Sequence, residues 1–136
     1  MAPEKALPER LQAAWNKRNS DDFATLFAPN GVRHEWALPG ARLVGREAIS
    51  THVRAYMDAV PDCALNIRSI VACDDRIVVE WTFLGTHTGD LPGLPAAGEA
   101  VALPGVSVCE VQEGLLLEER VYWDAATLLA GAGVIS

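Results

Sequence analysis

The sequence predicts an α+β domain in which three helices of the first half pack on one face of a mostly antiparallel sheet formed by the second half. Up to about residue 60, apolar residues recur every three or four positions, which is the period of amphipathic helices. From residue 65 onwards they alternate with polar residues, which is typical of half-buried strands. Helices followed by a run of strands indicate an α+β arrangement around one core.

The first half contains candidates for three helices, at residues 4–18, 20–27 and 46–60, and for one short strand, at residues 32–36. Ser20 and the two acids after it would cap and begin the second helix, and Pro29-Asn30-Gly31 would end it. The third helix rests on the apolar residues Ile49, Val53, Tyr56 and Val60. The stretch between the short strand and Gly45 reads as a loop.

The second half contains candidates for four strands, at residues 65–71, 76–85, 100–111 and 115–123, and for a closing helical turn at residues 124–129. A loop rich in Gly, Pro and Leu, residues 88–99, separates the second and third of these strands. Asp124 lies where the last strand ends and the closing turn begins. It could be a catalytic carboxylate or a helix cap, and its position favours the cap.

Length and charge limit the classes of function. The 136 residues carry no linker or internal repeat, so we expect a single domain over residues 1–136. A net charge of -7 argues against nucleic acid and anionic membranes as partners. No apolar run approaches the roughly 20 residues that span a bilayer, and the N-terminus lacks a signal-peptide pattern. Three widely spaced cysteines suggest reduced thiols in a cytoplasmic protein.

Four strings carry a resemblance to a known family: GREAI, AVPD, GTHTGDLPGLPAAG and EGLLLEERVYWD. They resemble the SnoaL-like polyketide cyclases of the NTF2-like superfamily, over a stretch from about Leu11 to Gly133. The resemblance implies a cone-shaped α+β barrel with a hydrophobic pocket, no metal and no organic cofactor, and homodimers or higher homo-oligomers built through the sheet. It also implies cofactor-free ring closure of a small apolar or aromatic metabolite.

The resemblance breaks at the groups that carry cyclase chemistry. The family's catalytic aspartate aligns with Val121, and its Gln and His partners fall on Gly105 and Ser107. The charged groups of the related epoxide hydrolases fall on Trp81, Phe83 and Val121. Any activity of this chain therefore needs other groups.

The first strand, VRHEW, holds the densest chemistry that remains. Ketosteroid isomerases of the superfamily place their general base at the end of this strand, and its counterpart here is Glu35. A carboxylate in an apolar cavity has a raised pKa and is a workable base near neutral pH, and a neighbouring His titrates in the same range. We therefore expect Glu35 or His34 to be catalytic. Adjacent strand residues point to opposite faces, so one of the two could face solvent instead.

Aromatic residues are expected around the cavity. The candidates for its substrate-binding wall are Trp36, Tyr56, Trp81, Phe83, His87, Ser107, Val121 and Trp123. As ordinary core residues they would need no function, but five aromatic side chains around a cavity suit a flat, largely apolar ligand. His87 could instead be a structural residue that bonds loop backbone. His52 is expected on the solvated side of its helix, and Glu119 on the surface of the sheet.

Three functions stay open. The first is a cofactor-free cyclase or isomerase that positions a polyketide-like metabolite and moves a proton with Glu35 or His34. The second is a non-catalytic or auxiliary protein that binds such a metabolite or partners a reductase in oxygenation. The third is a general NTF2-like protein with an unrelated ligand.

Overall fold

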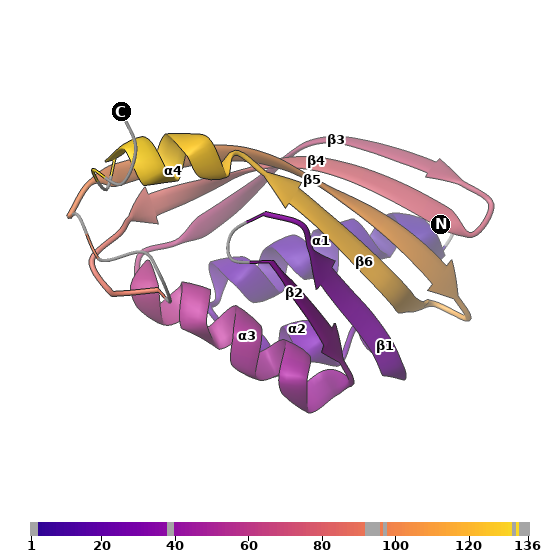
Figure 1. The fold of residues 1–136 in the computed structure, drawn as a ribbon. Coiled ribbons are helices and arrows are strands. Elements are labelled where there is room, and N and C mark those ends of the chain that lie inside the picture. Colours follow the sequence, from indigo (N-terminus) through magenta and orange to yellow (C-terminus); the bar gives the residue numbers. More distant parts are fainter. Residues whose placement is uncertain (1–2, 38–39, 92–95, 97, 132, 134–136) are drawn as a thin grey trace.

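The computed structural model describes residues 3–37, 40–91, 96, 98–131 and 133, and it confirms the predicted α+β class (Figure 1). Three helices lie on one face of a six-stranded sheet: α1 (Pro3–Asn16), α2 (Ser20–Ala24) and α3 (Arg46–Ala59). The strands are β1 (Phe27–Glu35), β2 (Ala41–Val44), β3 (Ala64–Cys73), β4 (Arg76–Thr86), β5 (Ala100–Gln112) and β6 (Leu115–Trp123). A short helix, α4 (Ala125–Gly131), follows the last strand.

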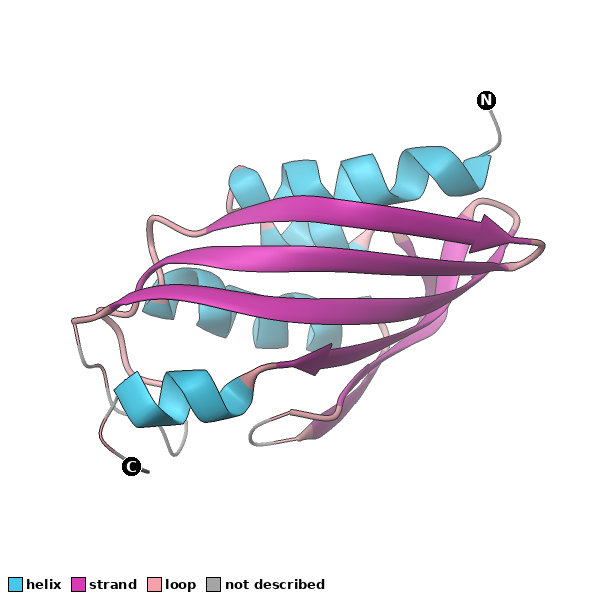
Figure 2. Ribbon diagram, turned by 90° about the horizontal axis from the view of Figure 1, so that it is seen from above, coloured by secondary structure: helices cyan, strands magenta, loops and turns pink. Residues whose placement is uncertain are grey.

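The sheet has the order β2-β1-β6-β5-β4-β3. Its neighbours are antiparallel except for β1 and β6, which are parallel. Seen from above, the long strands run side by side over the helices and the sheet bends away at one edge (Figure 2). The parallel pair joins the first strand to the last, so that Glu35 lies in register with Val121.

Helix α1 covers the sheet with its apolar side and also protects an edge of the sheet. The side-chain oxygen of Gln12 accepts from the backbone N–H of Ile67 at 2.8 Å, and that of Asn16 accepts from the N–H of Leu65 at 2.7 Å. Both acceptors therefore satisfy donors of the edge strand β3. The helix ends two residues earlier than predicted, because Arg18 has a left-handed φ of 53°.

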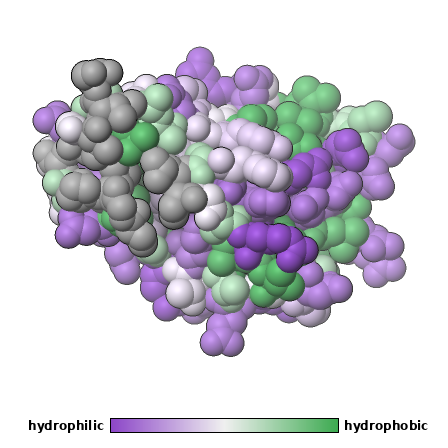
Figure 3. Space-filling model, in the orientation of Figure 1, coloured by the Kyte–Doolittle hydropathy of each residue, from purple (hydrophilic) through white to green (hydrophobic). Residues whose placement is uncertain are grey.

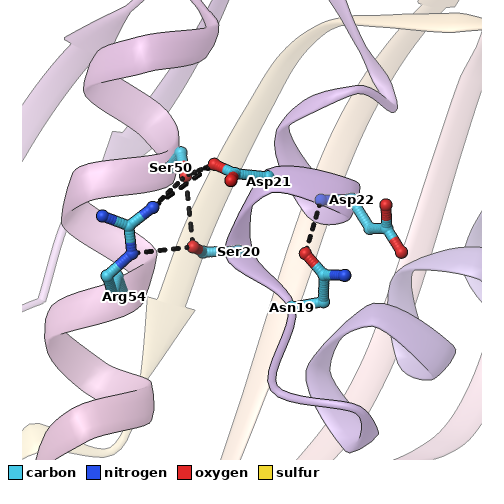
Figure 4. Close-up of polar contacts among 6 residues, drawn as sticks. All are labelled: Asn19, Ser20, Asp21, Asp22, Ser50 and Arg54. Atoms are coloured by element: carbon cyan, nitrogen blue, oxygen red, sulfur yellow. Dashed lines mark hydrogen bonds and ion pairs between the residues drawn. The ribbon is translucent and has the colours of Figure 1, made fainter.

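A polar cluster joins α2 to α3 (Figure 4). The hydroxyl of Ser50 donates to the carboxylate of Asp21 at 2.6 Å and accepts from the hydroxyl of Ser20 at 3.1 Å. Arg54 donates to the hydroxyl of Ser20 at 3.2 Å. The N-cap of α2 is Asn19, whose side chain accepts from a backbone N–H at 3.0 Å, so the expectation that Ser20 caps this helix is wrong.

Two stretches differ from the sequence prediction. Pro29-Asn30-Gly31 does not end a helix but lies inside β1, at a bulge where the register with β6 shifts. A Cβ on Gly31 would lie 3.0 Å from the carbonyl oxygen of Leu116, so the close approach of the two strands favours glycine. Residues 41–44, expected in a loop, form β2 and pair with the end of β1.

The core lies between the helices and the sheet. Trp15 packs edge-on against Phe23 and Phe83, with ring centroids 5.6 and 5.7 Å apart. On the outside, hydrophobic and hydrophilic residues are interspersed over the face seen in Figure 3. None of the helices in the described ranges is both long and apolar enough to cross a membrane.

Candidate functional site

A cavity lies between the inner face of the sheet and the helices that cover it. Together with the solvent space at its mouth, it contains about 820 Å³ of empty space. Most of the wall is apolar. The polar and titratable residues on it are Arg33, Glu35, Tyr56, His87, Ser107 and Glu119. Within the described part of the chain, no three His, Cys, Asp or Glu side chains are grouped as metal ligands would be.

Glu35 presents a buried, oriented carboxylate to this cavity. The hydroxyl of Tyr56 donates to its Oε1 at 2.5 Å, and the indole N–H of Trp123 donates to the same oxygen at 2.8 Å. Burial and the charge of Glu35 raise the pKa of Tyr56, so the phenol keeps its proton and remains a donor. The other oxygen, Oε2, accepts no hydrogen bond from any described residue. One oxygen is therefore held in place by two donors, and the other is buried without a hydrogen bond from the described residues.

His52 lies beside this carboxylate rather than in solvent, which corrects the sequence prediction. Its Nε2 is 3.4 Å from Oε2 of Glu35, and its ring contacts that of Tyr56 at 5.3 Å. Burial lowers the pKa of His52, and the positive charge of Arg33 lowers it further, against the opposite effect of Glu35. The neutral imidazole is therefore favoured. The sequence did contain a sign of the contact between His52 and Tyr56. The two residues are four positions apart, which places both on one face of α3.

A second polar group extends along the floor of the cavity. Arg33 and Glu119 form a buried ion pair, with side chains only 6% and 5% exposed, so Glu119 is not the surface charge expected from the sequence. Ser107 donates to the carboxylate of Glu119 at 2.7 Å and accepts from the indole N–H of Trp81 at 3.0 Å. Burial acts to lower the pKa of Arg33, but the carboxylates of Glu119 and Glu35 outweigh it, and the pKa is raised. The guanidinium therefore stays charged inside the molecule.

Val121 lies in the middle of these polar groups. It is in register with Glu35 on one side and with Ser107 on the other. A Cβ on Gly105, one inward position along β5, would lie 2.2 Å from the ring of Trp81. The indole therefore fills the space that a side chain at Gly105 would need. The centre of the sheet's inner face is apolar where it borders the carboxylate of Glu35.

The structure brings most of the expected site residues to the cavity. Those that line it are Glu35, Tyr56, Trp81, Phe83, His87, Ser107, Val121 and Trp123. His34 and Trp36 do not line it, because the alternation of the strand points Glu35 inwards and its two neighbours outwards. Trp36 is 54% exposed and stacks on His34 and on Tyr122, with centroids 3.9 and 6.3 Å apart. The expectation that His34 and Trp36 act in the pocket is corrected accordingly.

Asp124 caps α4, as predicted. Its carboxylate accepts from the backbone N–H of Thr127 at 3.0 Å and from the hydroxyl of Thr127 at 2.6 Å. These hydrogen bonds lower the pKa of Asp124. The residue does not line the cavity.

The bent sheet, the helices that cover one face of it and the largely apolar cavity between them define the fold class of the NTF2-like superfamily. The chain belongs to the SnoaL-like polyketide cyclase family, whose sequence profile matches residues 5–131. No curated protein sequence matches it.

Solved structures show the same fold at low sequence identity. AclR, a candidate hydroxylase from Streptomyces galilaeus, is 24% identical, with a TM-score of 0.85 over 100% of this chain and 88% of AclR. IdmH, a candidate polyketide cyclase from Streptomyces antibioticus, is 23% identical, with a TM-score of 0.81 over 98% of this chain and 100% of IdmH. A SnoaL-like protein from Jannaschia Sp. CCS1 is 16% identical, with a TM-score of 0.86 over 98% of this chain and 94% of that one. At these identities the likeness establishes the fold alone.

Proposed function

We propose that the protein is a cofactor-free cyclase or isomerase for a polyketide-like or other flat, apolar metabolite, and that Glu35 moves the proton. The observation that carries the proposal is the state of this carboxylate. It is buried in an apolar cavity, one oxygen is held by Tyr56 and Trp123, and the other has no hydrogen-bond partner among the described residues. This arrangement suits a general base, because the carboxylate is oriented and one of its oxygens carries no hydrogen bond that would compete for the proton. A substrate would reach this oxygen by displacing the side chain of His52, which lies 3.4 Å from it.

The chemistry needs no oxidant or reductant. Oε2 of Glu35 takes a proton from a carbon next to a carbonyl group, and the electron pair of that C–H bond forms an enolate. In an isomerisation the proton returns from Glu35 to a different carbon. In a ring closure the enolate carbon attacks a second carbonyl carbon of the same molecule, a C–C bond forms, and the new alkoxide takes the proton from Glu35.

Two features of the wall support this chemistry. The guanidinium of Arg33 lies two residues before Glu35 on the same face of β1, and while it stays paired with Glu119 its N–H groups would stabilise a developing enolate. The aromatic rings of Trp81, Phe83 and Trp123 offer flat surfaces that would hold a folded substrate close to the geometry of reaction.

Carbon-acid exchange tests the proposal without knowledge of the natural substrate. The probe is 2-tetralone, a flat bicyclic ketone with acidic C–H groups, and the measurement is its exchange of hydrogen for deuterium in D₂O by NMR. The wild-type protein should accelerate the exchange. Glu35→Gln should lose about 10²–10⁴-fold of this acceleration, because the amide can accept from Tyr56 and Trp123 but cannot take the proton.

His34→Gln is the matched control, because His34 precedes Glu35 in the chain but faces away from the cavity. It should exchange the probe at the wild-type rate. Equal rates for Glu35→Gln and the wild type, both above the rate without protein, would remove Glu35 from the mechanism.

A specific observation favours a second candidate, an auxiliary protein that binds such a metabolite without transforming it. Val121 and Gly105 are apolar where SnoaL-like cyclases are expected to carry polar catalytic groups, and Trp81 fills the space beside them. For an auxiliary protein, the wild type should bind 2-tetralone but leave its exchange at the rate without protein. The exchange assay therefore separates the two candidates.

A further inference from the structure

We propose that His87 forms a second polar subsite of the cavity, which binds a hydroxyl or carbonyl oxygen of the ligand at a place separated from Glu35. This inference deepens the proposed function by naming the class of ligand, and it rests on that function only in assuming that the cavity takes a flat apolar molecule. It holds for a catalyst and for an auxiliary binding protein alike.

The imidazole of His87 is buried without a hydrogen bond. The residue is 1% exposed and is one of those that line the cavity. Neither Nδ1 nor Nε2 has a partner among the described residues. Its backbone is satisfied, since its N–H donates to Glu99 and its carbonyl accepts from Gly98, both at 2.9 Å. A hydrogen bond from the ring to loop backbone, the structural role considered for this residue, is absent from the part of the loop that the structure describes.

Two unsatisfied nitrogens on one buried ring need an explanation. More than about 90% of buried polar groups in proteins have a hydrogen-bond partner, and leaving one without a partner costs about 1–3 kcal/mol. A ligand oxygen in the cavity would satisfy one nitrogen and so recover part of this cost on binding. This is the behaviour of a binding residue rather than of a core residue.

The backbone around His87 is held against the end of α3, which fixes the point from which the side chain extends. The N–H of Gly89 donates to the carbonyl of Ala59 at 2.9 Å, and a Cβ on Gly89 would lie 2.9 Å from the Cα of Ala59. A Cβ on Gly85 would lie 2.3 Å from a methyl carbon of Val60. Both glycines of the GTHTG string therefore allow β4 and its loop to approach the helix, and His87 between them is directed into the cavity.

The register of the sheet separates His87 from Glu35. Glu35, Val121, Ser107 and Val79 lie in one row across β1, β6, β5 and β4. His87 follows Val79 by eight residues, beyond the inward-facing Trp81 and Phe83 of the same strand. A ligand that reached both groups would carry oxygen atoms at two places with an apolar body between them.

The chemistry of an imidazole narrows the class of ligand. Neutral histidine offers one donor and one acceptor, so a hydroxyl can pair with either nitrogen and a carbonyl with the donor. The neighbouring wall, which includes Phe83, Leu91 and Leu103, offers no charge for an anionic group. We therefore infer an uncharged, flat metabolite with a hydroxyl or keto oxygen on the part that lies beside His87.

The experiment compares the dissociation constants of 2-naphthol and naphthalene, measured by fluorescence titration of the full chain. The wild type should prefer 2-naphthol by about 3- to 10-fold, the value of one net hydrogen bond. His87→Phe should bring the two constants close to each other. Glu35→Gln and the control His34→Phe, on the outer face, should keep the preference.

Each alternative result has a separate meaning. A preference that disappears in Glu35→Gln but survives in His87→Phe would place the hydroxyl at the carboxylate and overturn the subsite, while the proposed function would survive. If Glu35→Gln keeps the wild-type rate of 2-tetralone exchange while His87→Phe loses the preference for 2-naphthol, Glu35 is not the base. The subsite at His87 then remains supported. The two proposals therefore fail in different ways.

Stability gives an independent measurement. Because the ring nitrogens have no partners, His87→Phe should unfold at a urea concentration equal to or higher than that of the wild type. His87→Leu is the second variant, in case a phenyl ring is too large for the site. If both variants unfold at clearly lower urea concentrations, the ring has a structural role and the proposal is wrong.

Discussion

Replacing Glu119 by leucine should destabilise the fold far more than the loss of an ordinary carboxylate on a strand. Glu119 is the partner of Arg33, and neither side chain is exposed enough for solvent to screen the charge that remains. Breaking a buried ion pair by removing one partner costs about 3–5 kcal/mol. Ser107 also loses the acceptor of its hydroxyl, which adds about 1 kcal/mol. We expect a total loss of about 4–6 kcal/mol, against a total stability of about 5–15 kcal/mol for a domain of ordinary stability.

Urea unfolding of four proteins measures this effect. The wild type and Glu119→Leu give the cost itself. Glu118→Leu is the matched control, because Glu118 is the preceding residue but lies on the outer face with a partly exposed side chain, and its pair with Arg120 is worth at most about 1 kcal/mol. The double variant Arg33→Met with Glu119→Leu should recover most of the loss, since apolar residues replace both charges.

Two results would refute this reasoning. A cost below about 1 kcal/mol for Glu119→Leu would mean that water reaches the guanidinium. A double variant as unstable as Glu119→Leu would mean that the carboxylate stabilises the fold by another route than its pair with Arg33.

Three further predictions concern single residues. Asp124→Ala should lower the urea midpoint of unfolding, because α4 loses its cap. Since the pKa of Asp124 is lowered from 3.8, this stabilisation is present above that value and disappears as the pH falls through the folded pKa. The pKa of His52 is lowered from 6.5, so the stability due to its neutral form is present above about pH 6.5 and decreases below it. His52→Gln cannot be protonated in this range, so its unfolding temperature should fall less steeply than that of the wild type as the pH is lowered below 6.5. A thiol reagent should modify the exposed Cys73 in the native protein. The thiols of Cys63 and Cys109 should react only after unfolding, because both are buried and burial raises their pKa.

Each of these has a clear contrary result. An Asp124→Ala protein that is folded but has lost the exchange of 2-tetralone would give Asp124 a catalytic role. Identical acid profiles for His52→Gln and the wild type would mean that His52 is solvated. Rapid modification of three thiols in the native state would contradict the burial of two of them.

The sequence predicted the elements with strong periodicity almost to the residue. The helix expected at 46–60 is Arg46–Ala59, and the strand expected at 115–123 is Leu115–Trp123. Residues 41–44 were missed, because four residues are too few for an alternating pattern to stand out. Glu35 was predicted as a pocket acid because ketosteroid isomerases of the superfamily place their general base at the end of the first strand, and Glu35 occupies that position.

The errors at the site come from contacts between distant parts of the chain. The paired acids Glu118 and Glu119 must face opposite sides of the sheet, but nothing in the sequence names Arg33, 86 residues earlier, as the partner of the inner one. His34 was expected in the pocket and His52 in solvent, but the structure places His34 on the outer face, stacked on Trp36, and His52 beside the carboxylate of Glu35. Only the packing of α3 over the end of β1 decides between them.

The parallel pairing of β1 with β6 affects the order in which the molecule can fold. Glu35 and Trp123, which share a hydrogen bond, are separated by 88 residues. A loop of this length must close before the bond can form, and proteins that depend on such remote contacts fold more slowly. During synthesis, β1 leaves the ribosome long before β6, so Arg33 lacks Glu119 and Glu35 lacks Trp123 until the last strand is added. The cavity and the hydrogen bonds of its carboxylate are therefore complete only when β6 pairs with β1.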